Sequence, residues 1–193
     1  MYNISKAILP QMTGQIRIIG GRWRGRNIRF PETPGLRPTP SRVRETLFNW
    51  LGQDLPEYQC LDLFAGSGAL GFEALSRGAA RVVMVEKQLA TARCLRDNAQ
   101  RLGASGAEIV VAEALQWLRR DKQRFDLVFL DPPFAGQDLE QALPLIHERL
   151  NPGGMVYCES PKGVSESPLW SEFRSSRAGR VTHQLLKPEQ GSV

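Results

Sequence analysis

The sequence has no long apolar run and few cysteines. No apolar stretch approaches the length of a membrane span, and residues 1–10 contain neither an extended apolar region nor a cleavage pattern. We therefore expect a cytoplasmic protein without a signal peptide or a membrane partner. The three cysteines are scattered and have no metal-ligand spacing, which suits a reducing compartment. We expect neither disulfides nor a bound metal.

The sequence also lacks a recognisable serine–histidine–acid set, which argues against nucleophilic catalysis of that type. The two histidines, His147 and His183, lie far from the motifs described below. We expect both at surface or packing positions, and Cys158 in the core. A length of 193 residues suffices for one domain with a buried core, and an apolar fraction of 41% is ordinary for a globular protein.

Positive charge is concentrated near the N-terminus, and there it is all arginine. Residues 14–45 contain eight arginines and two glutamates, a local net charge of +6, whereas the whole chain carries +5. Arginine binds phosphate through a planar pair of donors and stacks on bases, so this segment indicates a nucleic-acid partner. A solvated basic face is the alternative. Trp23 and the glycine-rich surroundings favour binding.

The chain divides into three predicted regions: a flexible tail at 1–13, a basic extension at 14–52 and an α/β domain at 53–190. Within the extension, residues 15–30 are typical of a β-hairpin or ribbon around Gly20 and Gly21, with arginines on one face. Thr39 is predicted to be the N-cap of the helix that follows, with Pro40 at its first position.

From residue 60 onward, strand and helix patterns alternate. Strands are predicted near residues 60–64, 81–85, 107–111, 126–130 and 154–159. Helices are predicted near residues 68–78, 88–102, 113–120 and 137–149. Such alternation indicates a parallel, doubly wound sheet, and two further strands at 173–176 and 181–186 are joined directly. The expected class is α/β, a seven-stranded Rossmann-like sheet with a C-terminal β-hairpin and a small N-terminal ribbon and helix.

A glycine-rich turn connects the first of these strands to the next helix. Gly66, Gly68 and Gly71 fit a dinucleotide fingerprint, so the loop alone is compatible with a dinucleotide or with S-adenosylmethionine (SAM). Asp62, just before the loop, can pair with the ammonium of a bound amino acid, a group that SAM carries and NAD lacks. We therefore favour SAM. Glycines that serve only helix–strand packing are the alternative.

Acidic residues end the next two strands. Glu86 follows Gly68 by 18 residues, where a carboxylate accepts hydrogen bonds from ribose hydroxyls of either cofactor. Glu113 stands where SAM enzymes contact the adenine edge. Each glutamate taken alone is also ordinary at a strand end or a helix start.

Residues 131–134, Asp-Pro-Pro-Phe, come directly after the apolar run 125–130. The two prolines end the strand and place a carboxylate and an aromatic ring at the carboxyl edge of the sheet, where open α/β sheets bind ligands. The motif is typical of enzymes that methylate an exocyclic amino nitrogen. The Asp131 carboxylate and the Pro132 carbonyl can accept the two amine hydrogens, and Phe134 can stack on an unstacked base. A turn that only caps the strand is the alternative.

Together these segments resemble the bacterial small-subunit rRNA guanine-N2 methyltransferases of the D type. The matching stretches are residues 18–26, 37–49, 61–71 and 131–134, within a resemblance that runs from about 14 to 186. The arginine ribbon and residues 37–49 narrow the choice to this family, because the SAM motifs are widely shared. The resemblance implies a SAM-dependent methyltransferase fold and SAM as cofactor. It also implies 16S rRNA, within the small ribosomal subunit, as the partner whose guanine N2 amine is methylated.

Carried onto this sequence, the resemblance implies three groups of site residues. Those that address the target amine are Asp131, Pro132 and Phe134. Those that bind the cofactor are Asp62, Phe64, Ala65, Gly66, Gly68, Glu86, Lys87, Glu113 and Ala114. Those that contact RNA are Arg22, Trp23, Arg24, Arg26, Arg37, Thr39 and Arg42. The family more often has aspartate where this chain has Glu113.

Other functions stay open on the sequence. An adenine-N6 methyltransferase of RNA or DNA is the nearest alternative, although no separate target-recognition domain supports a sequence-specific DNA enzyme. An NAD-dependent oxidoreductase lacks a visible acid or base for hydride transfer. A non-catalytic RNA-binding or ribosome assembly protein that keeps the SAM fold is disfavoured by the intact Asp131 and Phe134.

Overall fold

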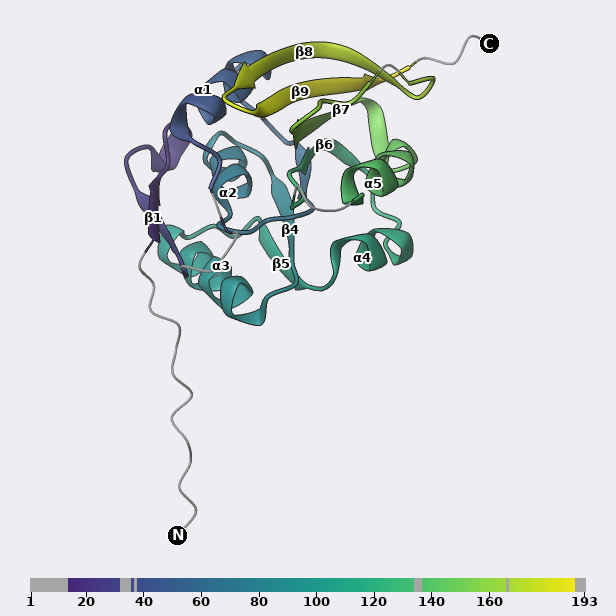
Figure 1. The fold of residues 1–193 in the computed structure, drawn as a ribbon. Helices are drawn as coiled ribbons and strands as arrows, with labels where there is room; N and C mark the ends of the chain where they lie inside the picture. Colours follow the sequence, from purple (N-terminus) through teal and green to yellow (C-terminus); the bar gives the residue numbers. More distant parts are fainter. Residues whose placement is uncertain (1–13, 32–35, 37, 134–136, 166, 190–193) are drawn as a thin grey trace.

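The computed structural model describes residues 14–31, 36, 38–133, 137–165 and 167–189. Its centre is a seven-stranded sheet with the order β5-β4-β3-β6-β7-β9-β8 (Figure 1). The strands are β3 (Gln59–Asp62), β4 (Arg81–Glu86), β5 (Ala107–Val111), β6 (Phe125–Leu130), β7 (Leu150–Ser160), β8 (Trp170–Ala178) and β9 (Val181–Pro188). Strands β3 to β7 pair in parallel, whereas β9 runs antiparallel to both β7 and β8. The strand order reverses between β3 and β6, the point at which open α/β sheets bind ligands.

Helices cover both faces of the sheet. One face packs against α1 (Ser41–Trp50), α2 (Ala69–Ser76) and α3 (Leu89–Leu102), and the other against α4 (Ala114–Arg120) and α5 (Asp138–His147). Strand β4 shows the consequence: Val82 and Met84 belong to the first hydrophobic cluster, and Val83 and Val85 to the second. Since successive side chains of a strand alternate between faces, a strand buried on both sides is apolar throughout.

The predicted doubly wound α/β sheet and its C-terminal hairpin are confirmed. Strand β7 begins at Leu150, before the predicted start at 154. Pro152, Gly153 and Gly154 read as a turn in the sequence, but they lie within β7 where its pairing with β6 shifts register. A bulge of this kind takes up residues that a strand pattern excludes.

The N-terminal extension forms a two-stranded antiparallel sheet, as predicted. Strand β1 (Gly14–Arg17) pairs with β2 (Asn27–Phe30), and a short 3-10 helix, η1 (Gly21–Trp23), lies between them. Trp23, which is 6% exposed, joins the hydrophobic cluster under α2 together with Ile18 and Ile28. The ribbon and the α/β domain therefore share one core.

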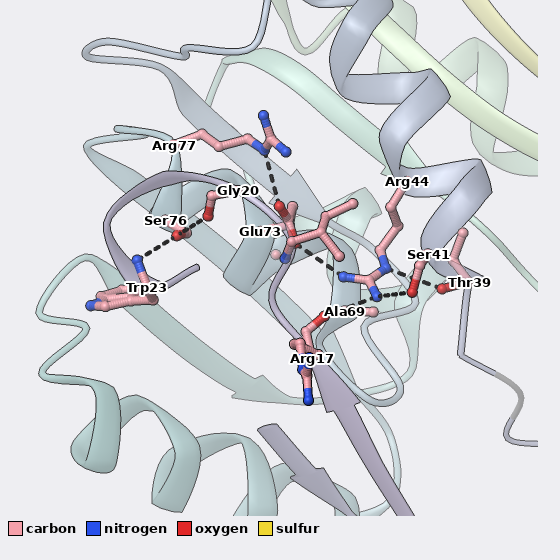
Figure 2. A network of polar contacts seen from close by, with 12 residues as sticks. Arg17, Gly20, Trp23, Thr39, Ser41, Arg44, Ala69, Glu73, Ser76 and Arg77 are labelled. Atoms are coloured by element: carbon pink, nitrogen blue, oxygen red, sulfur yellow. Dashed lines mark hydrogen bonds and ion pairs between the residues drawn. The ribbon is translucent and has the colours of Figure 1, made fainter. Parts of the chain in front are cut away.

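A buried ionic network fastens this extension to α2 (Figure 2). Glu73, on α2, is fully buried, and its carboxylate lies 3.0 Å from Arg44 Nη1 and 3.0 Å from Arg77 Nε. The same carboxylate accepts a hydrogen bond from the Ile19 backbone N–H at 3.0 Å. Arg44 also donates to the Arg17 carbonyl at 3.1 Å. Arg44 was counted in the basic segment, but at 1% exposure it holds the fold together and does not face solvent.

The predicted N-cap of α1 is wrong by one residue. Helix α1 begins at Ser41, and Pro40 occupies the cap position without a side-chain hydrogen bond. The Thr39 hydroxyl instead donates to Glu159 Oε1 at 3.1 Å, and the Thr39 carbonyl accepts from Arg44 Nε at 3.2 Å. The Thr39 hydroxyl therefore bonds a distant residue, Glu159, and does not cap the first turn of α1.

Candidate active site

A cavity of about 850 Å³ opens at the carboxyl ends of β3, β4 and β6. Most of the sequence-predicted cofactor residues line it, as do Asp131 and Pro132 of the predicted amine site. The lining residues among the predicted cofactor set are Asp62, Phe64, Ala65, Gly66, Glu86, Lys87, Glu113 and Ala114. The structure thus brings together residues that lie as far apart as 62 and 132 in the sequence.

The glycine turn after β3 forms one edge of this cavity. Gly66 and Gly68 have φ values of +50° and +78°, in the left-handed region that favours glycine. A Cβ added at Gly68 would lie 2.6 Å from Leu95 Cδ2 and 2.8 Å from the Phe72 ring, so the turn is also packed tightly against the helices. Gly68 does not line the cavity, and its role in the structure is to make the turn and open α2.

Asp62 lies at the end of β3, almost fully buried at 4% exposure. Its Oδ2 accepts a hydrogen bond from the Gly71 N–H at 3.1 Å. Burial raises the pKa of Asp62 to about 7; the Gly71 hydrogen bond opposes this rise, and the nearby Glu86 carboxylate adds to it. A cation placed against Asp62 would reverse the rise, because an opposite charge favours the ionised form. The carboxylate is therefore suited to the ammonium group of an amino acid.

Glu86 is tied to the turn by two backbone donors. Its Oε2 accepts from the Gly66 N–H at 3.1 Å and its Oε1 from the Gln88 N–H at 2.6 Å. The carboxylate is thereby fixed at the end of β4, where it can accept further hydrogen bonds from sugar hydroxyls. Lys87, beside it, is exposed and also lines the cavity.

Glu113 has a structural role as well as a place in the lining. It is the N-cap of α4, and its carboxylate accepts from the backbone N–H groups of Leu115 at 3.3 Å and Gln116 at 2.9 Å. Ala114, the next residue, is buried at the cavity wall. The helix cap fixes both residues just beyond the end of β5, the strand that pairs with β4, at whose end Glu86 lies.

Asp131 and Pro132 follow β6 and face the same cavity. Burial raises the pKa of Asp131 well above its ordinary value, and the negative charges of Glu159 and Asp62 raise it further. Three carboxylates thus surround one part of the cavity, which favours a ligand that brings positive charge or hydrogen-bond donors. Phe134, the third predicted residue of the amine site, lies outside the described residues.

Sequence reasoning missed a cluster beside Asp131. Glu159, near the end of β7, accepts hydrogen bonds at Oε1 from the Tyr157 hydroxyl at 3.0 Å and the Thr39 hydroxyl at 3.1 Å. His183 of β9 pairs with Glu159 in register, and its Nδ1 lies 2.9 Å from the Tyr157 hydroxyl oxygen. His183 was expected at a surface or packing position, but it lines the cavity at 3% exposure. A glutamate near the carboxyl end of an apolar strand was the available signal.

The predicted RNA-contacting residues differ in exposure and in partners. Arg22, Arg24 and Arg42 have exposed side chains. The Arg26 guanidinium donates to the backbone carbonyls of Arg101 and Leu102 at the end of α3. Trp23 and Thr39 are buried. Arg37 lies outside the described residues. Exposed arginines on the ribbon and at the start of α1 therefore form the available cationic surface.

Among the described residues, no cluster of three or more histidine, cysteine, aspartate or glutamate side chains has the arrangement of a metal site. No helix in the described part of the chain is long and apolar enough to cross a membrane. Cys60, Cys94 and Cys158 are all buried.

Known proteins resemble this chain along nearly its whole length. The family model described as "Conserved hypothetical protein 95" matches residues 16–187. Ribosomal RNA small subunit methyltransferase D of Escherichia coli K12 is 44% identical over 182 residues, which cover 92% of each chain. The protein of the same name from Haemophilus influenzae is 41% identical over 195 residues, covering 95% of this chain and all of the relative.

The fold agrees with these relatives. The solved structure of Escherichia coli yhhF has a TM-score of 0.82 and 44% identity, and the match covers 91% of this chain and 99% of that one. The matched residues 16–187 include the ribbon, the glycine turn, Asp131 and the β7–β9 cluster. This chain therefore belongs to the Conserved hypothetical protein 95 family, and it has the Rossmann-like methyltransferase fold.

Proposed function

We propose that this protein transfers a methyl group from SAM to the exocyclic N2 amine of a guanine in 16S rRNA, in the cytoplasm. The observation that carries the proposal is the convergence of Asp62, Glu86 and Asp131 on one cavity at the switch point of the sheet. The names of the two relatives support small-subunit rRNA as the substrate. The Asp-Pro-Pro-Phe motif supports an exocyclic amine as the acceptor, and the family resemblance narrows that acceptor to guanine N2.

Fit of the cavity to SAM rests on its acidic and backbone groups. Asp62 would hold the ammonium and Glu86 the ribose hydroxyls, while Glu113 and Ala114 would border the adenine. The glycine turn exposes backbone where a side chain would otherwise fill space, since Gly66 adopts a positive φ. When bound, SAM supplies an electrophilic methyl group on a sulfonium.

The amine requires help from the protein because its lone pair is delocalised into the purine ring. The Asp131 carboxylate and the Pro132 carbonyl would each accept one amine hydrogen, which turns the lone pair towards the methyl donor. As the nitrogen gains a carbon, it must lose a proton, and Asp131, which lines the cavity and would already accept an amine hydrogen, would take it. Its raised pKa makes Asp131 a better proton acceptor than an ordinary carboxylate.

RNA would approach over the ribbon and α1. Arg22, Arg24 and Arg42 offer exposed guanidinium groups for phosphates, and the target base would leave its stack to reach Asp131. In this proposal the small ribosomal subunit presents the base; the relatives' names support small-subunit rRNA as the substrate.

Nucleoside mass spectrometry of small-subunit rRNA tests this proposal in cells. We expect rRNA from cells that lack the gene to lose one N2-methylguanosine, and the gene supplied in trans to restore it. Loss of N6-methyladenosine instead would identify the adenine alternative. An unchanged nucleoside profile would contradict an rRNA substrate.

A further inference from the structure

The wall of the cavity next to Asp131 carries a polar cluster that the SAM site does not use. Its members come from distant segments: Thr39 before α1, Tyr157 and Glu159 of β7, and His183 of β9. Glu159 and His183 are 5% and 3% exposed, and both line the cavity with Thr39. Buried polar groups of this kind stay only where hydrogen bonds satisfy them.

Hydrogen-bond directions within the cluster follow from its geometry. Tyr157 has one hydroxyl hydrogen, which it donates to Glu159 Oε1 at 3.0 Å. The Tyr157 oxygen must then accept from His183 Nδ1, at 2.9 Å, so Nδ1 carries the hydrogen in this arrangement. Burial lowers the pKa of His183 and favours its neutral form. Nε2 of a neutral ring protonated at Nδ1 is an acceptor.

Two acceptors of the cluster are left with spare capacity. Glu159 Oε1 receives both hydroxyls, whereas Oε2 has His183 Nδ1 at 3.5 Å as its ion-pair neighbour. A carboxylate has about four lone-pair sites, so Glu159 can accept at least one more hydrogen bond. His183 Nε2 is buried and has no hydrogen-bond partner among the described residues. His183 Nε2 is itself inaccessible, so the acceptors on this part of the wall are the carboxylates of Glu159 and the nearby Asp131.

Only some bases complement a wall of acceptors. Guanine presents two adjacent kinds of donor on its Watson–Crick edge, N1–H and the N2 amine. Adenine and cytosine each place a ring-nitrogen acceptor beside their exocyclic amine, and that acceptor would face a carboxylate without a hydrogen between them. A buried acceptor left without a donor has lost its hydrogen bond to water and gained none in return, which disfavours binding. The cluster therefore discriminates against these bases at the ring nitrogen, one atom away from the reacting amine.

We propose that Glu159, held by the Thr39 and Tyr157 hydroxyls and by His183, accepts the N1–H of the target guanine and so selects guanine over adenine. The proposal rests on the proposed function, because it assigns the base within the same site. Asp131 addresses the amine and Glu159 the neighbouring ring nitrogen. Tyr157 acts through Glu159 as a positioning residue.

The test replaces Glu159 with glutamine and compares two bases at the methylated position. One rRNA carries guanosine there and the other 2,6-diaminopurine riboside, which keeps the C2 amine but has an acceptor at N1. The site is first located with the wild-type protein, and rRNA ligated from a synthetic fragment supplies the replacement. Glu148→Gln is the matched control, since Glu148 has a side chain that is 71% exposed and lies away from the cavity.

We expect the wild type and Glu148→Gln to prefer guanosine by about 100-fold in kcat/KM, within the range expected when one buried acceptor is left unpaired. Glu159→Gln should lose about 100-fold on guanosine and narrow the preference to about tenfold or less, because an amide can donate to the N1 acceptor. Its Kd for SAM should match that of the wild type. Tyr157→Phe removes one of the two hydroxyls that hold Glu159 and should also reduce the preference for guanosine over diaminopurine. This variant provides the test if Glu159→Gln does not fold.

Equal losses on both bases in a variant that folds and binds SAM would overturn the proposal, since they would mean a role without base selection. A wild-type protein that uses diaminopurine as well as guanosine would overturn it too. Failure of the proposed function gives a different result: the wild type would methylate no guanosine in the first step.

Discussion

Replacing Glu73 with glutamine tests how the N-terminal extension is held on the methyltransferase domain. In the wild type, one buried carboxylate balances two guanidinium groups whose side chains are only 1% and 6% exposed, those of Arg44 and Arg77. Glutamine has the same shape as glutamate but no charge, and its amide N–H group is a donor that faces another donor, a guanidinium. Both arginines would then be buried without an opposite charge.

The magnitude follows from the burial. Removing one partner of a buried ion pair lowers the free energy of unfolding by about 3–5 kcal/mol. Glutamine keeps one oxygen acceptor for Arg44, Arg77 or the Ile19 N–H, so we expect the lower end, about 3 kcal/mol. With an m-value of about 2 kcal/mol per M of urea, the unfolding midpoint would fall by about 1.5 M.

Urea unfolding monitored by circular dichroism measures this shift, and Glu108→Gln is the matched control. Glu108 pairs with Arg81 at the surface, where their side chains are 46% and 37% exposed. Exposed pairs contribute about 0–1 kcal/mol, so the control midpoint should fall by less than about 0.5 M. If the Glu73 and Glu108 variants lost the same stability, the buried network would not be what fastens the extension.

Two further predictions concern the cofactor and the RNA. The Kd for SAM, measured by calorimetry, should fall as pH rises through about 7, because a proton on Asp62 competes with the ligand ammonium below the Asp62 pKa of about 7. Asp62→Asn should bind SAM weakly and without that pH dependence. A wild-type Kd that is flat between pH 6 and 7.5 would contradict the ammonium assignment. Replacing Arg22 and Arg24 with alanine should reduce the slope of log K for RNA binding against log salt concentration by about 1.4, at about 0.7 per phosphate contact. The same replacement of the exposed pair Arg119 and Arg120 of α4 is the control and should leave the slope unchanged. An unchanged slope in the Arg22 and Arg24 variant would mean that the ribbon does not bind phosphate.

Local patterns predicted most of the fold because central strands of the parallel sheet, such as β4, bury apolar side chains on both faces. The four βα units from β3 to α5 were predicted for this reason, and the hairpin around Gly20 and Gly21 was predicted from the β-type residues on either side of those glycines. The errors lie where a long-range contact overrides a local signal. Thr39 has the chemistry of an N-cap, but Glu159, 120 residues away, takes its hydroxyl. Arg44 has the charge of a phosphate ligand, but Glu73 retains it in the core.

The candidate site was predictable where a motif is continuous in sequence. Asp62, Glu86 and Asp131 each end a strand, and parallel strands bring such ends to one edge. Glu159 and His183 escaped detection because their proximity depends on the antiparallel return of β9 against β7, which fixes their register. Burial of Trp23 was hidden for a similar reason, since it depends on contacts with α2, where the Trp23 backbone N–H donates to the Ser76 hydroxyl oxygen at 2.9 Å.

Methyl transfer by purified protein, followed base by base, tests the central claim most directly. Small-subunit rRNA from cells that lack the gene is incubated with isotope-labelled SAM and digested to nucleosides for mass spectrometry. We predict labelled N2-methylguanosine with the wild type and with the surface control Asp97→Ala, and a rate about 100- to 1,000-fold lower with Asp131→Ala at an unchanged Kd for SAM. Label in any other nucleoside, or full activity of Asp131→Ala, would contradict the account.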